Sequence, residues 1–128
     1  MSNDPYEEGL KIRKAVLGEE YVDRTLANVN SFDAPLQRLL TEYCWGKVWG
    51  RPGLDRKQRS LLNLAMISVL NRPHELKAHI RGALTNGVTP AEIREVFLQV
   101  MIYAGAPAAV DSFRIANEVF ADNAVTIT

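Results

Sequence analysis

The sequence contains one cysteine, Cys44, and no Cys-x-x-Cys pair. A lone cysteine cannot form a disulfide within the chain, so the fold needs no oxidising compartment. A cysteine between Tyr43 and Trp45 in an apolar helix is also more typical of a small core residue than of a reactive thiol. The sequence therefore argues against a disulfide scaffold and against thiol chemistry.

An excess of charge is also missing, because 15 basic and 15 acidic residues give a formal net charge of zero. Balanced charge removes the electrostatic attraction that draws proteins to nucleic acid or to an anionic membrane, and it favours self-association. No apolar run approaches the roughly 20 residues of a membrane span, and the first residues lack the apolar core of a signal peptide. We expect a soluble, cytoplasmic protein with no nucleic-acid partner and no membrane partner.

Common metal and nucleotide motifs are absent as well. His74 and His79 are five residues apart, which turns the two rings about 140° from each other on a helix, whereas HExxH needs a spacing of four. Glu75 and His79 alone supply two ligands, and zinc sites need three or four. The chain has neither a glycine-rich phosphate loop nor a Gly-x-Ser-x-Gly elbow. We expect no metal site.

No segment of strand length alternates apolar and polar residues, whereas apolar residues recur at steps of three and four through most of the chain. The sequence thus predicts an all-α fold of six or seven helices in one domain, residues 1–128, with a helical N-terminal arm at about 4–30. The tail 125–128 is expected to be disordered or bound to a partner. The predicted helices start near Asp4, Glu19, either Ser31 or Asp33, Asp55, Pro73, Thr89 and Pro107.

Helix caps support these boundaries. Asp4 before a proline is typical of an N-cap, and Thr89 with Glu92 three residues later forms a capping box. Pro73 suits a first turn, and Gly87 suits the left-handed residue that ends a helix.

We expect the chemistry at the helical pair between Arg51 and Gly87. Glu75 and His79, four residues apart, share one helix face. The alternative is structural, since charges at a helix start are usually solvated and Glu75–His79 can be a simple surface pair. The polar residues of this region are Glu42, Arg51, Arg56, Arg59, Ser60, Arg72, Glu75 and His79.

Several segments here resemble one known family. The most specific is Arg-Pro-Gly-Leu-Asp-Arg at 51–56 followed by Arg-Ser-Leu-Leu at 59–62, with Trp45-Gly46 before it. His79 and the stretches 86–96 and 103–109 continue the likeness at unbroken spacing. On these residues, from about 6 to 120, the chain resembles the γ-carboxymuconolactone decarboxylases of protocatechuate catabolism in the β-ketoadipate pathway.

This resemblance implies the helical fold of the alkylhydroperoxidase D superfamily and a homo-oligomer, commonly a trimer or hexamer. Aligned through His79, the two cysteines that carry peroxidase chemistry in that superfamily fall on Arg72 and Glu75. Because a thiolate is the nucleophile in that chemistry, a thiol peroxidase is excluded.

The implied reaction needs no cofactor. Its substrate is a lactone that carries a carboxylate and an acetate arm, and the electrons released with carbon dioxide flow through the ring double bond into the lactone carbonyl. The protein must hold the acetate arm with a cation, supply a donor to the carbonyl oxygen and protonate the ring carbon.

As a hypothesis, His79 donates the proton, because an ordinary pKa of about 6.5 suits that role, and Glu75 orients the ring or holds its charge. Arg59 or Arg51 binds a carboxylate with both oxygens. Ser60 and Glu42 complete the polar set, and Trp45 and Trp49 are either pocket wall or core. The alternatives are a non-catalytic oligomer that binds a small carboxylate or a protein, and another lactone decarboxylase of the same fold.

Overall fold

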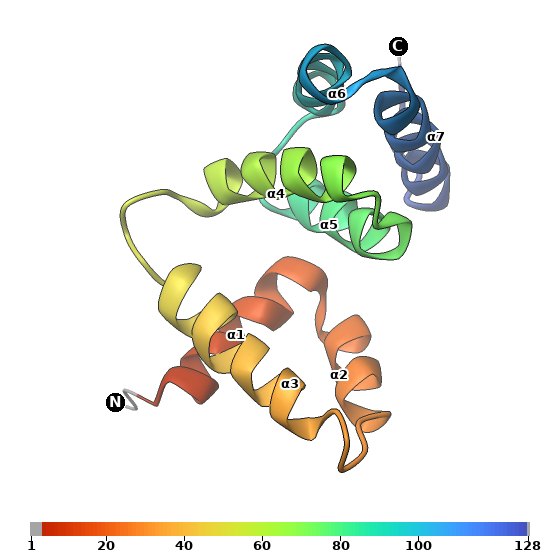
Figure 1. The fold of residues 1–128 in the computed structure, drawn as a ribbon. Coiled ribbons are helices and arrows are strands. Elements are labelled where there is room, and N and C mark those ends of the chain that lie inside the picture. The colour runs from red at the N-terminus through yellow and green to blue at the C-terminus, as the bar shows by residue number, and fades with distance from the viewer. Residues whose placement is uncertain (1–3, 128) are drawn as a thin grey trace. The chain divides into compact units, whose positions relative to one another are not determined.

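The structure is a computed structural model that describes residues 4–127. Over these residues the chain forms seven α-helices and one π-helix and no strand, which confirms the all-α prediction (Figure 1). The chain divides into two compact units, unit 1 within Met1–Asp55 and unit 2 within Arg56–Thr128. The single-domain organisation remains a prediction. None of the helices within residues 4–127 has the length and apolar character needed to cross a membrane.

Unit 1 contains four helical elements. The side chain of Asp4 accepts a hydrogen bond from the Tyr6 N–H, as its N-cap position predicts, and α2 ends two residues earlier than expected. Helices α1 and α2 pack on each other, and α1 also packs along η1, so the predicted arm is part of a larger unit. The elements are α1 (Pro5–Leu17), α2 (Glu19–Ala27), α3 (Ala34–Leu39) and the π-helix η1 (Leu40–Val48).

The close packing of α1 on η1 depends on two glycines. A Cβ atom on Gly9 would lie 1.8 Å from the backbone oxygen of Thr41, and one on Gly46 would lie 2.4 Å from the backbone oxygen of Pro5. Both distances are far inside van der Waals contact. Glycine at these two positions therefore lets the two backbones approach.

The π-helix differs from the sequence prediction, in which three- and four-residue spacing indicates an ordinary α-helix that starts near Asp33. The Trp49 N–H donates to the Cys44 carbonyl, five residues earlier, at 2.9 Å. Such wide turns are rare and often occur at functional sites.

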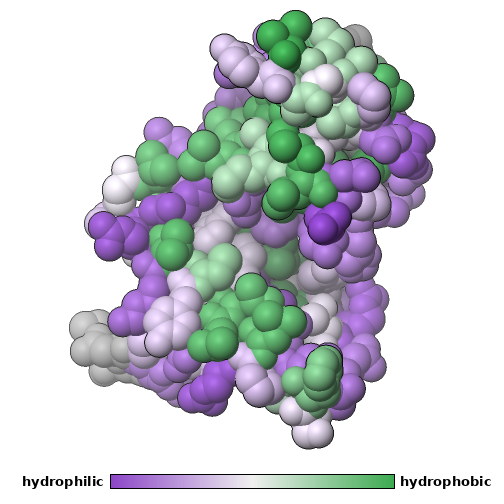
Figure 2. All heavy atoms as spheres, viewed as in Figure 1, coloured by the Kyte–Doolittle hydropathy of each residue, from purple (hydrophilic) through white to green (hydrophobic). Residues whose placement is uncertain are grey.

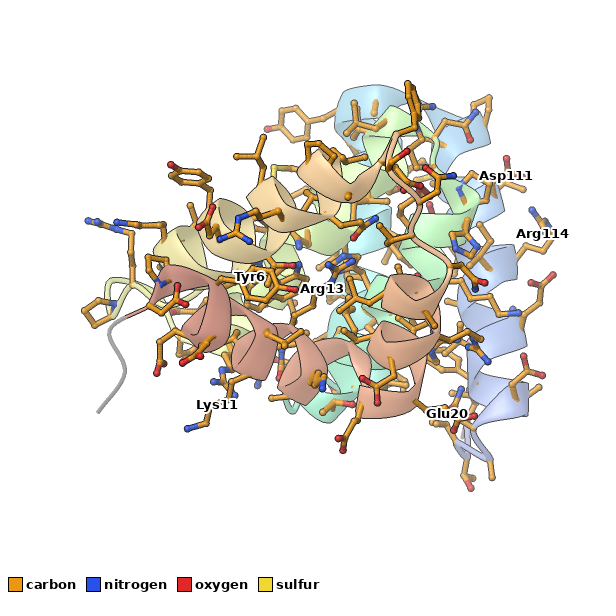
Figure 3. All side chains as sticks on the ribbon, turned by 90° about the horizontal axis from the view of Figure 1, so that it is seen from below. Tyr6, Lys11, Arg13, Glu20, Asp111 and Arg114 are labelled. Atoms are coloured by element: carbon orange, nitrogen blue, oxygen red, sulfur yellow. The ribbon has the colours of Figure 1, made fainter. Side chains whose placement is uncertain are left out.

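A buried arginine links α1 to η1 in unit 1. Arg13 on α1 is only 6 % exposed and donates from Nη1 to Thr41 Oγ1 at 3.1 Å (Figure 3). Burial lowers the pKa of this guanidinium, and the rings of Tyr21 and Tyr6 and the Cys44 thiol act in the opposite direction. Figure 3 also labels Tyr6 on the same helix, and its ring lies 5.4 Å from the Arg38 guanidinium carbon.

Unit 2 is a bundle of four helices around one apolar core. Helix α4 packs against α5 and α6, and α7 covers α5 and α6. The Thr89–Glu92 capping box is present, and Gly87 has φ +90°, as their positions in the sequence predict. The four helices are α4 (Arg56–Leu70), α5 (Pro73–Thr85), α6 (Pro90–Ala104) and α7 (Ala106–Asp122).

The core of unit 2 reaches the end of the described chain. Val125 packs against the core cluster, and its N–H donates to the Phe120 carbonyl at 2.9 Å. With Ala124 at φ +54°, this is the hydrogen-bond pattern of a Schellman motif, which also brings an apolar residue back onto the helix. The prediction of a disordered or partner-bound tail is therefore wrong for Val125, and Thr128 lies outside the described residues.

Candidate functional site

The predicted site residues fall in both units of the chain. Glu42, Trp45, Trp49 and Arg51 belong to unit 1, whereas Arg59, Ser60, Glu75 and His79 belong to unit 2.

Trp45 and Trp49 lie in the core of unit 1. Their rings stack with centroids 4.7 Å apart, and the residues are 4 % and 6 % exposed among Ile12 and Val16. The sequence left open whether these two tryptophans form core or pocket wall, and the structure places them in the core. Their contact with substrate remains a prediction.

Glu42 and Arg51 lie at and just beyond the π-helix. Glu42 is half-buried, and its Oε1 is 3.8 Å from Nη2 of Arg38, a long and partly solvated ion pair. Arg51 is exposed, and its N–H donates to the Val48 carbonyl at 3.1 Å. The proposed contact of either residue with substrate remains a prediction.

Ser60 joins the start of α4 to the end of α5. Its buried hydroxyl accepts a hydrogen bond from Nδ2 of Asn86 at 2.9 Å. Because Asn86 is the C-cap of α5, this bond fixes the two helix ends together. Arg59, the residue before it, is half-buried. Arg72 donates to the carbonyls of Leu70 and Asn71 and thus caps the end of α4.

His79 and Glu75 lie one turn apart on α5. His79 is half-buried, whereas Glu75 is exposed. Burial of the ring lowers the pKa of His79 to about 4, and the Glu75 carboxylate opposes this shift with a smaller effect. With that pKa only about one ring in a thousand is protonated at pH 7. The reason given for a proton-donor role, an ordinary pKa near neutrality, is therefore wrong.

One polar neighbour of His79 was missed by the sequence reasoning. Nδ2 of Asn63 on α4 lies 3.4 Å from Nδ1 of His79. Asn63 and His79 are each eight residues from Asn71, the residue with φ +57° between α4 and α5. In an antiparallel helical hairpin, residues equally far from the turn lie opposite each other, so the spacing in the sequence carried this signal.

The described residues offer little support for a metal site or for a reactive thiol. Among residues 4–127 no group of three or more His, Cys, Asp and Glu side chains is close enough to hold a metal ion. Cys44 is half-buried in unit 1, and burial raises the pKa of its thiol, which makes the reactive thiolate scarcer.

Comparisons with known proteins place this chain among decarboxylases. The profile of the carboxymuconolactone decarboxylase family matches residues 34–118, from α3 to α7. A nitrosuccinic acid decarboxylase of Metarhizium robertsii is 48 % identical over 117 residues, which is 91 % of this chain and 82 % of that protein. The 4-carboxymuconolactone decarboxylase of Acinetobacter baylyi is 44 % identical over 117 residues, 91 % of this chain and 87 % of that protein.

A shorter match points to the same group. A 4-carboxymuconolactone decarboxylase of Pseudomonas putida is 39 % identical over 41 residues, 32 % of this chain and 85 % of that sequence. The chain belongs to the carboxymuconolactone decarboxylase family.

Proposed function

We propose that this protein decarboxylates 4-carboxymuconolactone to the enol-lactone of β-ketoadipate, in the catabolism of protocatechuate. The observation that carries this proposal is the 44 % identity over 91 % of the chain to an enzyme of that name. The Arg-Pro-Gly-Leu-Asp-Arg and Arg-Ser-Leu-Leu segments at 51–62 agree with it. The reaction needs no cofactor, because the unsaturated lactone accepts the electrons that carbon dioxide leaves behind.

The substrate is a dianion, and its recognition needs a cation. Arg59 or Arg51 binds a carboxylate through two parallel hydrogen bonds, since a planar guanidinium matches both oxygens. Glu75 acts through its charge on the neighbouring His79 ring. Ser60, Glu42, Trp45 and Trp49 are proposed to bind substrate.

A second candidate substrate is nitrosuccinic acid, which the 48 % identity to a decarboxylase of that name favours. The two molecules share a chemical pattern. Each carries two carboxylates, and the carbon that loses carbon dioxide is joined to a group that accepts electrons, a nitro group in one and an unsaturated lactone in the other. Decarboxylation of either therefore needs no electron sink from the protein.

One assay separates these functions. The purified protein is incubated with each substrate, and carbon dioxide release is measured together with ultraviolet absorbance. We expect turnover of the lactone with a kcat/KM at least about 100-fold above that for nitrosuccinate, because polar groups built for one acceptor are left unpaired by the other. Faster turnover of nitrosuccinate would select the second candidate. Binding without carbon dioxide release would favour the non-catalytic alternative.

We also propose that the protein works in the cytoplasm as a homo-oligomer, a trimer or a hexamer. Unit 2 exposes large apolar side chains on α4 and α6, and Figure 2 shows apolar residues over α4. Leu62, Val69 and Tyr103 line an apolar groove of about 330 Å³, and none of the predicted site residues lines it. The most exposed of these apolar side chains are Leu62, Met66, Val69, Leu70, Ile102 and Tyr103.

A second copy of this chain is the partner that suits this face. Residues 60–70 and 96–104 contain no charged side chain, so a charged partner finds no complement there. An apolar patch of this kind is typical of an interface between proteins. The molar mass in solution, measured by light scattering, tests the proposal, and a monomeric mass would contradict it.

A further inference from the structure

The contact between Asn63 and His79 favours a proton on one particular nitrogen of the imidazole. A side-chain amide nitrogen only donates hydrogen bonds, so Nδ2 of Asn63 needs an acceptor at Nδ1 of His79, 3.4 Å away. Nδ1 accepts only when it carries no proton. In a neutral imidazole the proton then sits on Nε2.

We propose that Asn63 is a positioning residue that holds His79 as the neutral Nε2–H tautomer, so that His79 donates a hydrogen bond to the lactone carbonyl oxygen. The inference rests on the proposed function for the identity of that oxygen. It gives His79 the role of the donor at the developing negative charge and leaves the delivery of the proton to water.

The electrons balance in this scheme. The bond between the ring carbon and the departing carboxylate breaks, and carbon dioxide leaves. The electron pair forms a new ring double bond, the old double bond shifts toward the carbonyl carbon, and the carbonyl oxygen becomes an enolate. A proton from water then adds to the ring carbon next to the carbonyl as the carbonyl re-forms. The Nε2–H bond stabilises the enolate oxygen while its charge is largest.

The surroundings of the ring favour the same neutral state. Burial disfavours the imidazolium and lowers the pKa of His79 to about 4. The Glu75 carboxylate opposes this shift with a smaller effect than burial. Both helices packed on α5 also carry charged groups, whereas the pKa of His79 follows mainly from burial. These charged groups are Arg56, Lys57 and Arg59 on α4 and Asp111, Arg114, Glu118 and Asp122 on α7.

The test is Asn63→Asp, which exchanges a donor for a negatively charged acceptor. We expect the proton to move to Nδ1 and the pKa of His79 to rise by more than one unit, because the new carboxylate favours the imidazolium. Nitrogen-15 NMR of the imidazole reports both quantities. The spectrum of the parent protein should show a protonated Nε2 and a bare Nδ1 at pH 7. His74→Gln, which removes the other histidine, assigns the signals.

Activity adds a second readout. In Asn63→Asp only the imidazolium carries a proton on Nε2, so kcat should fall as the pH rises through the new pKa of His79. At high pH the loss in kcat should reach about 100-fold, because that is the typical cost of losing one such hydrogen-bond donor. The parent protein should show no such fall. A residue that merely fills space would not create this pH dependence.

Asn63→Leu is the matched control, since leucine has a similar size and no donor. It should keep the pKa of His79 well below 6.5, because burial remains, while the preference for the Nε2–H tautomer weakens. A parent protein with its proton on Nδ1, or an Asn63→Asp variant that is folded by circular dichroism and has an unchanged tautomer and pKa, would overturn the proposal. If Asn63→Asp does not fold, the parent spectrum and Asn63→Leu decide.

The NMR result does not involve substrate. Failure of the parent protein to decarboxylate either candidate substrate would therefore remove the proposed function, whereas the wrong tautomer would remove only the role of Asn63.

Discussion

Replacing His79 with leucine is expected to lower kcat for 4-carboxymuconolactone by about 10²–10³-fold. Leucine fills the half-buried position on α5 but offers no donor to the enolate oxygen, and losing one donor of this kind costs about that factor. KM should change much less, because the donor matters most when charge develops on the oxygen. Steady-state kinetics on the purified variant measures both constants.

Glutamine at the same position distinguishes the two possible roles of His79. His79→Gln keeps an amide N–H near the position of Nε2, so a hydrogen-bond role predicts that it retains about tenfold more activity than His79→Leu. Proton transfer predicts that both variants are equally poor, because an amide does not exchange a proton at neutral pH. His74→Gln is the surface control on the same helix and should keep the activity of the parent. A His79→Leu variant within a few-fold of the parent would exclude His79 from the chemistry.

The second large effect is expected from Gly9→Ala in unit 1. The added Cβ would lie 1.8 Å from the Thr41 carbonyl oxygen and 2.8 Å from the Gly46 nitrogen, both backbone atoms of η1. Backbone does not give way as a flexible side chain does, so α1 must move off η1. We expect a loss of about 3 kcal/mol or more in the free energy of unfolding of unit 1.

Tryptophan fluorescence reports this unfolding directly, since both tryptophans, Trp45 and Trp49, lie in the core of unit 1. Urea titration should therefore show a lower midpoint for Gly9→Ala. Gly53→Ala is the matched control, because a Cβ there meets no atom within 4 Å. It should leave the midpoint unchanged or raise it slightly, as alanine restricts the unfolded chain. Equal midpoints for the two variants would contradict the close α1–η1 contact.

The helices of this chain are largely predictable because their signals are local. Asp4 before Pro5 and the Thr89–Glu92 box act within a single turn, and both caps form as their spacing predicts. Gly87 similarly marks the end of α5 through its own φ. Such caps depend on three or four neighbouring residues and little on the rest of the fold.

The features that the sequence reasoning missed depend on contacts between distant residues. Within the π-helix the apolar residues have the ordinary three- and four-residue spacing of an α-helix, so no local signal in the sequence distinguishes the two. The sequence predicts a disordered or partner-bound tail at Val125, because the packing of this residue against the unit 2 core is visible only once the helices are assembled.

The residues of the candidate site can be proposed from the sequence, whereas the electrostatics of the site cannot. His79 stands out in the sequence by its spacing from Glu75, yet its pKa of about 4 follows from burial between helices. Asn63 lies in an apolar run and attracts attention only when the α4–α5 hairpin is folded about Asn71.

The pH dependence of kcat/KM for the lactone tests the central claim most directly, because it reports the protonation state of the free enzyme that carries out the reaction. If His79 acts as a hydrogen-bond donor through Nε2–H, kcat/KM does not fall between pH 5 and pH 8, because the neutral ring, with its pKa of about 4, carries that proton throughout this range. If the imidazolium is the active form, kcat/KM decreases about tenfold for each unit of pH above that pKa. A tenfold decrease per unit between pH 5 and pH 8 would contradict this account.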